Sequence, residues 1–398
     1  MIVRADTLDV APVCDAVIHA RTGGYDEDVE HGDIAWCNEL ALHVLEFKTN
    51  GPAPTLTGAL VARFQDEVRL AHETLAPLGA RLMPGAMHPW MDPHRELRLW
   101  PHGYSTVYEA FDRAFDCTGH GWANLQSSHL NLPFADDEEF GRLHAAIRVI
   151  LPILPALAAA SPFADAKATG LMDTRLEVYR HNARRVPSVS GRIIPEPIFT
   201  RDEYENTLLA GLYRDIAPHD PGGALRHEWL NARGAIARFD RDTIEIRVLD
   251  TQECPRADIA IHHAVVEVLR GLVEERWSSL CDQQSWGVEP LADMLLRAVK
   301  DAGAAPIDND DYLALFGVPA GGAGTMRDLW GRLIEDVVAV SPHADQVLVG
   351  ALRAVHREGC LAQRMLRALG TGEPTRDRLH ALHAELCACL AEGTLFRA

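Results

Sequence analysis

The segment from Asp242 to Asp250 carries the side chains best suited to chemistry in this sequence. It reads Asp-Thr-Ile-Glu-Ile-Arg-Val-Leu-Asp, and the alternation of a β-strand puts Glu245 and Arg247 on one face with Thr243 and Leu249. A carboxylate can hold a cation, and a guanidinium can bind an anionic oxygen. The pattern therefore predicts a site for both. The alternative is a cross-strand salt bridge on an exposed face.

Two further acidic residues, Glu39 and Glu46, stand among Leu, Val and Phe in the segment from Asn38 to Thr49. Carboxylates in such an apolar strand need partners. Because seven residues separate them, a straight strand would put them on opposite faces, and a shared site requires a bulge or a bend between them. The alternative is a pair of edge-strand carboxylates that face water.

A third segment, Gly121 to Pro133, places Ser127, His129 and Asn131 on one strand face. His129 is a candidate metal ligand, although a lone histidine on a strand is more often a hydrogen-bonded core or surface residue. His88 and His94 lie in another His-rich segment. Their spacing is not of the HExxH type, so a structural role is expected for both.

These residues need elements to position them, and the sequence changes character along its length. The first half alternates short apolar runs with turn residues, and from about Pro255 onward the pattern is almost wholly helical. We therefore expect an α+β fold, with an α+β body over 1–285 and a helical C-terminal region over 286–398 packed on the same domain. The expected helices are 57–78, 137–160, 201–213 and 255–277, and the expected strands are 40–48, 122–134 and 235–250.

Composition excludes several classes of protein. With 57 acidic and 38 basic residues the formal net charge is -19, which disfavours nucleic acid and anionic membranes as partners. No apolar run reaches the ~18 residues of a spanning helix. The first residues resemble neither a secretory nor a transit signal, and the eight cysteines lack paired CxxC spacing, so a cytoplasmic protein with reduced thiols is expected. The Gly-rich segment 319–325 lacks the lysine of a phosphate-binding loop and is expected to be a connector.

Taken together, the motifs resemble the glutamate-cysteine ligase family, in its bacterial carboxylate-amine ligase branch. The likeness covers roughly residues 1–280. It is carried by the following segments: Leu45-Glu-Phe-Lys-Thr49, Gly85-Ala-Met-His-Pro-Trp90, Ser128-His-Leu-Asn131, Asn231-Ala-Arg-Gly-Ala-Ile-Ala-Arg238 and Ile244-Glu-Ile-Arg-Val-Leu-Asp250. The resemblance implies a fold like the catalytic domain of glutamine synthetase, in which a curved, mainly antiparallel sheet has helices outside and the active site on its concave face.

The resemblance also implies an activity. Members use ATP to convert glutamate to a γ-glutamyl phosphate, which cysteine or another amine attacks to give an amide, a reaction of glutathione biosynthesis when the amine is cysteine. ATP and Mg²⁺, or Mn²⁺ in its place, are the implied cofactors, and a homo-oligomer is compatible with the family. The identity of the amine stays open.

The roles that the resemblance implies fall on particular residues. Carried over one by one, metal binding falls to Glu39, Glu46, His129 and Glu245, and binding of the transferring phosphoryl group falls to Arg247, which with Glu245 forms the catalytic pair. Magnesium prefers hard oxygen ligands, and a guanidinium fork can bind two phosphoryl oxygens. Arg233 and Arg238 are expected near the nucleotide. Tyr179, Arg180 and Asn131 are expected at the substrate.

The chain departs from the family pattern at its beginning. The family usually starts with a strand reading approximately Gly-x-Glu-x-Glu, and this acidic pair is absent here. The expectation is a shortened, under-ligated enzyme. The alternative is a nucleotide- or amino-acid-binding regulatory homologue that no longer transfers phosphate. A third interpretation is a metal hydrolase that uses His88 or His129.

Overall fold

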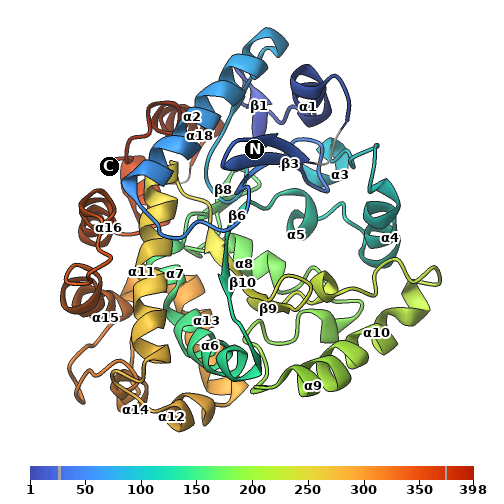
Figure 1. Cartoon of the computed structure of the whole chain (residues 1–398). Coiled ribbons are helices and arrows are strands. Elements are labelled where there is room, and N and C mark those ends of the chain that lie inside the picture. Colours follow the sequence, from blue (N-terminus) through green and yellow to red (C-terminus); the bar gives the residue numbers. More distant parts are fainter. Residues whose placement is uncertain (26–27, 373) are drawn as a thin grey trace.

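The computed structural model describes residues 1–25, 28–372 and 374–398. It is a mixed α and β structure with small antiparallel sheets, and about half of its residues are helical. Figure 1 shows the short strands near the middle of the molecule with the helices around them. The expected mixture of strands and helices is confirmed at this level. Within the described ranges, no helix is both long and apolar enough to cross a membrane.

The strands that the structure describes pair in short antiparallel ladders. Two sheets have three strands each, in the orders β6-β10-β9 and β2-β3-β4, and β1 pairs with β5 and β7 with β8. The bounds are β1 (Ile2–Arg4), β2 (Asp28–His31), β3 (Ile34–Asn38), β4 (Leu45–Thr49), β5 (Ala80–Leu82), β6 (Ser127–Pro133), β7 (Phe163–Ala164), β8 (Lys167–Ala168), β9 (Ala235–Arg238) and β10 (Thr243–Asp250).

Helices connect and cover these strands. Their bounds are α1 (Cys14–Thr22), α2 (Gly58–Leu75), α3 (Pro93–Glu96), α4 (Ser105–Phe115), α5 (His120–Ala123), α6 (Asp137–Ile150), α7 (Pro155–Ala158), α8 (Thr174–Tyr179), α9 (Arg201–Glu203), α10 (Ala210–Ile216), α11 (Pro255–Val273), α12 (Leu280–Gln284), α13 (Val288–Asp301), α14 (Asp310–Ala314), α15 (Met326–Leu333), α16 (Gln346–Glu358), α17 (Leu361–Leu369) and α18 (Arg376–Glu392). The two that matter most for the site begin at residues suited to a helix start. The side chain of Thr57 accepts a hydrogen bond from the third residue of α2, and α11 begins with Pro255, which needs no amide partner.

One core joins the first and last parts of the chain. Its largest apolar cluster includes Ile147 of α6, Ile246 of β10, Val265 of α11 and Leu295 of α13, all buried. The indole of Trp330 in α15 donates a hydrogen bond to the carbonyl of Ile153 (2.8 Å). The helices after residue 286 therefore pack directly on the helices and sheet that precede them.

Three expected strands differ in extent from the observed ones. The expected strand 235–250 is two strands, β9 and β10, separated by a turn that ends at Asp242, which has a φ of 50°. The expected strand 122–134 starts only at Ser127, because α5 and a short connection precede it. The expected strand 40–48 starts only at Leu45.

The strict alternation expected for Thr243 to Leu249 is wrong at its far end. The pairing of β10 with β6 shifts register between Ile246 and Leu249, and this β-bulge interrupts the period of two. Leu249 is consequently buried in the main apolar cluster instead of sharing a face with Arg247.

Candidate active site

A cavity of about 1580 Å³ lies beside the sheet of β6, β10 and β9. It exceeds the ~300–1,000 Å³ typical of small-molecule pockets, so it has room for more than one substrate. Most of the residues expected at the site line it: Glu39, Glu46, His129, Asn131, Tyr179, Arg238, Glu245 and Arg247. Side chains from five separate segments of the chain therefore meet around one space.

Glu245 is the centre of the charged cluster on the sheet. Arg247 donates from Nε to Glu245 Oε1 (3.0 Å), and Arg238 Nη1 lies 3.5 Å from Glu245 Oε2. Burial alone would raise the pKa of Glu245, but the charges of Arg247 and His129 lower it to about 2. The carboxylate is therefore ionised at neutral pH, and its charge is shared by two arginines.

Arg247 is held from both sides. Besides its contacts with Glu245, it donates from Nη1 to the Tyr179 hydroxyl (3.5 Å). Burial acts to lower its pKa, but the Glu245 carboxylate raises it above the ordinary arginine value. A permanently charged fork at the cavity wall is suited to binding the oxygens of a phosphoryl or carboxylate group.

A hairpin, not a single bent strand, brings Glu39 and Glu46 together. β3 ends at Asn38, the chain turns, and Asn38 pairs with Leu45 at the start of β4. Glu39 follows one strand and Glu46 lies in the other. Burial and the neighbouring charge of Glu46 raise the pKa of Glu39 to about 7. The turn between β3 and β4 supplies the bend that a site shared by Glu39 and Glu46 requires.

His129 and Asn131 stand on β6, opposite the charged end of β10. Asn131 is the cross-strand partner of Glu245, and His129 Nδ1 lies 3.5 Å from Glu245 Oε1. The other ring nitrogen is 2.7 Å from the Ser127 hydroxyl. The side chain is 31% exposed, since it faces the wide cavity. Burial of the ring within the molecule nevertheless lowers the pKa of His129.

Two of the expected arginines do not line this cavity. Arg233 is buried and donates from Nη2 to Glu196 Oε1 (2.6 Å), and Arg180 donates from Nη2 to Glu177 Oε1 (2.9 Å). The carboxylates that bind them, Glu196 and Glu177, do not line the cavity either. His88 is buried, with Nε2 2.7 Å from the carbonyl oxygen of Leu8, which is a structural contact.

The cavity's donor set is compatible with magnesium in kind. In the part of the chain that the structure describes, no three His, Cys, Asp or Glu side chains are grouped closely enough to hold a metal ion. Mg²⁺, however, usually binds through one or two carboxylates, water and substrate phosphates. A bound cation would offset the repulsion between Glu39 and Glu46, which contributes to the raised pKa of Glu39.

Sequence reasoning missed two buried residues at the rim of the charged cluster. Arg175, at the start of α8, lines the cavity, and its guanidinium forms an ion pair with Asp250. Asp250 closes the Ile244–Asp250 motif, but nothing in a strand pattern shows that its side chain meets Arg175. Arg175 lies in an ordinary amphipathic helix start and carries no local signal.

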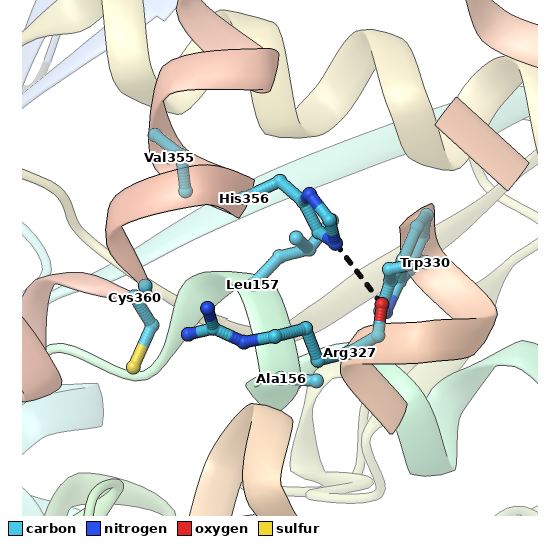
Figure 2. A pocket seen from close by; sticks show the side chains of 8 residues that line it. Ala156, Leu157, Arg327, Trp330, Val355, His356 and Cys360 are labelled. Carbon is cyan, nitrogen blue, oxygen red and sulfur yellow. Dashed lines mark hydrogen bonds between the residues drawn. The ribbon is translucent and has the colours of Figure 1, made fainter. Parts of the chain in front are cut away.

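A second pocket is too small to hold a substrate. It lies between α7, α15 and α16 and has a volume of about 10 Å³, close to the space one water needs. Figure 2 shows its lining, with the ring of His356 turned toward the carbonyl oxygen of Arg327, 3.0 Å away. The large cavity is therefore the candidate active site.

Comparisons with known proteins point in one direction. The sequence model of glutamate-cysteine ligase family 2 matches residues 15–385. An uncharacterized protein of Archaeoglobus fulgidus is 34% identical over 399 residues, which cover 99% of this chain and 97% of that protein.

Proposed function

The chain belongs to glutamate-cysteine ligase family 2, and from this membership we propose that it is an ATP-dependent carboxylate-amine ligase. Glutamate and cysteine are the substrates to test first, and other amines follow. The proposed fold is that of the glutamine synthetase catalytic domain, in which the β6-β10-β9 sheet forms part of the active-site wall.

One observation supports this proposal most strongly. Arg247 presents a charged fork at the wall of a cavity that Glu39, Glu46 and Glu245 also line. A ligase of this class must neutralise a phosphoryl group during transfer, and such catalysis is mostly positioning and electrostatics. An arginine beside clustered carboxylates supplies both an anion-binding group and oxygen ligands for a cation.

In the proposed reaction, an oxygen of the substrate carboxylate attacks the γ-phosphorus of ATP. The bond from that phosphorus to the bridging oxygen breaks, and ADP leaves with the electron pair. The amine then attacks the acyl carbon, phosphate leaves, and the nitrogen loses a proton to solvent. The product is an amide.

Each residue around the cavity has a defined task in this scheme. Arg247 binds the equatorial oxygens of the transferring group, and Glu245 holds the guanidinium of Arg247 in place. Arg238, which Asp240 also binds, contacts the second carboxylate oxygen of Glu245. Glu39, Glu46, Glu245 and His129 would hold magnesium, which when bound neutralises phosphate charge.

The test is ADP release from ATP and glutamate in the presence of magnesium, with and without cysteine and a panel of other amines, followed by mass analysis of the product. The proposal predicts amine-stimulated ADP release and a product with the mass of the amide. Arg247→Lys should lose most of this activity, on the order of 100-fold or more, and Arg353→Lys, an exposed arginine paired with Glu335, serves as the matched control. Absence of both ADP and amide across the panel would refute the proposal.

A second candidate function is a nucleotide- or amino-acid-binding regulatory protein. The observation that favours it is that, among the described residues, no group of three metal-binding side chains is assembled. This candidate predicts saturable nucleotide binding by calorimetry without ADP production. Turnover with any amine excludes it.

A further inference from the structure

The β-bulge in β10 lies at the residue that the proposed function depends on. Ile246 pairs with Leu130 and Leu249 pairs with Ser128. Two residues of β10, Arg247 and Val248, therefore stand opposite the single residue His129. Bulges of this kind re-aim side chains and are common beside active sites.

The extra residue changes which side chains share a face. Glu245 pairs with Asn131, and Asp250 pairs with Ser127. Because Ser127 and Asn131 are four residues apart on β6, they point to the same side of the sheet. Glu245 and Asp250, five apart, therefore share that side too, whereas a regular strand would put them on opposite faces.

Arg175 binds both residues of the bulge. Its guanidinium donates from Nη2 to the carbonyl of Val248 (2.6 Å) and from Nη1 to the carbonyl of Arg247 (3.4 Å). Its Nε donates to the carboxylate of Asp250. Arg175 and Asp250 have side chains that are 1% and 0% exposed. The buried guanidinium of Arg175 thus links the bulge backbone to the carboxylate of Asp250, which the bulge places on the same face as Glu245.

Arg175 is itself fixed by several contacts. Asp173 caps α8 by accepting from the amide of Leu176 (2.8 Å), and the amide of Arg175 donates to the Ser161 hydroxyl (3.0 Å). That hydroxyl donates to Asp250 Oδ2 (2.9 Å). The same helix ends at Tyr179, whose hydroxyl accepts from Arg247. α8 therefore contacts Arg247 twice. Arg175 binds the backbone carbonyl of Arg247, and Tyr179 binds its guanidinium.

We propose that Arg175 is a positioning residue that holds the β10 bulge and thereby aims the Arg247 guanidinium into the cavity. The catalytic part of this role rests on the proposed function of Arg247. Removal of the fork should let the bulge relax, turn Arg247 away from Glu245 and misplace the phosphoryl-binding group. A misplacement of about 1 Å can cost on the order of 100-fold in rate.

The kinetic test is a double-mutant cycle with Arg175→Lys and Arg247→Lys. Lysine at position 175 keeps the charge beside Asp250 but has one nitrogen where the guanidinium has three, so it cannot reproduce the planar fork that spans Asp250 and both carbonyls. If Arg175 acts through Arg247, Arg175→Lys lowers kcat 10- to 100-fold with a small change in the KM for glutamate. The double variant is then no worse than Arg247→Lys alone.

Arg364→Lys is the matched control. Arg364 is an equally buried arginine that pairs with Glu253 and donates to the carbonyl of Phe396, and it does not line the cavity. Its effect on activity should be small and should multiply with that of Arg247→Lys. If the double variant at Arg175 and Arg247 loses activity by the product of the two single losses, the proposal is overturned.

A crystal structure of Arg175→Lys decides the positioning role without any activity measurement. The expected result is a changed register between Ile246 and Leu249 and loss of the Arg247–Glu245 ion pair. An unchanged bulge and ion pair would overturn the proposal. If Arg175→Lys does not fold, Ser161→Ala removes one support of Asp250 and should show a smaller shift in the same direction, and no shift there counts against the proposal. If Arg175→Lys shows this structural shift but the wild-type protein has no ligase activity, the proposed function is refuted and the positioning role of Arg175 is not.

Discussion

At the scale of single residues, the site depends on a buried carboxylate whose charge is matched by arginines. Glu245→Gln removes the charge that Arg247 and Arg238 share, and it leaves the guanidinium of Arg247 poorly compensated, whereas Arg238 keeps its ion pair with Asp240. Because breaking a buried ion pair leaves an unpaired charge, we expect a loss of about 3 kcal/mol in the free energy of unfolding, measured with urea. Glu335→Gln, in an exposed pair with Arg353, should change stability little. Equal effects of the two variants would contradict the account of Glu245.

A second prediction concerns pH and His144, which is buried against the rings of Phe140 and Tyr204. Burial and the neighbouring charge of Arg148 lower the pKa of His144 to about 3, whereas an unfolded histidine has a pKa of about 6.5. As pH falls below 6.5 the unfolded chain gains a proton that the folded chain does not, so stability is lost on acidification. His144→Phe removes this loss.

The free energy of unfolding of the variant should therefore fall by about 2 kcal/mol less than that of the wild type between pH 7 and pH 5. The unfolded pKa of about 6.5 lies about 1.5 units above pH 5, and about 1.5 units correspond to that energy. Chemical denaturation at the two pH values measures it. An equal loss of stability between pH 7 and pH 5 in the two proteins would show that the ring of His144 does not stay neutral in the folded state.

At this scale the sequence predicted Glu39, Glu46, His129, Glu245 and Arg247 as members of one site, and all five line one cavity. It could not separate Arg238, which reaches Glu245, from Arg233, which is bound by Glu196. The two arginines sit in the same motif. Arg233 is bound by a carboxylate from a distant loop, whereas Arg238 is bound by the nearby Asp240 as well as by Glu245 of β10, and residue type carries no trace of that difference.

At the scale of elements, one carboxylate stabilises the starts of two helices. Asp345 accepts from the amides of Val347 and Leu348 in α16, and it also accepts from the amide of Gly58 in α2. Thr57 accepts only from Leu60. Asp345→Ala should therefore cost about 2 kcal/mol and Thr57→Ala about 1 kcal/mol.

Thermal or urea unfolding of the two variants checks this order, and Asp345→Asn should recover most of the loss because asparagine caps nearly as well as aspartate. A larger loss for Thr57→Ala than for Asp345→Ala would show that the shared cap is not formed. Because α2 borders the cavity through Leu60 and Phe64, the same cap supports the cavity wall.

The elements show where periodicity is informative and where it is not. The long helix from Pro255 was predicted closely, since its apolar spacing and first-turn proline agree. The bulge in β10 was not, because Arg247, Val248 and Leu249 all fit a regular strand. A bulge depends on the partner strand and on Arg175, which lies about seventy positions earlier in the chain.

At the scale of the whole molecule, the C-terminal helices share the core of the first part of the chain. Leu295 and Trp330 are buried in the same cluster as Ile147 and Val265. We expect α6 and α15 to unfold together in denaturant, with the same midpoint by hydrogen exchange. Two separate midpoints would show that the helical region is an independent unit.

The central claim for the whole molecule is that the cavity activates a carboxylate with ATP before the amine arrives. The most direct test is positional isotope exchange in ATP labelled with ¹⁸O at the bridge between the β- and γ-phosphorus atoms, with magnesium and glutamate but no amine. Reversible formation of an acyl phosphate frees the β-phosphoryl oxygens of bound ADP to rotate, so the account predicts that the label moves into non-bridging positions and that Arg247→Lys abolishes this movement. Label that stays in the bridge during amine-dependent turnover, or ATP that remains intact under every condition, would contradict it.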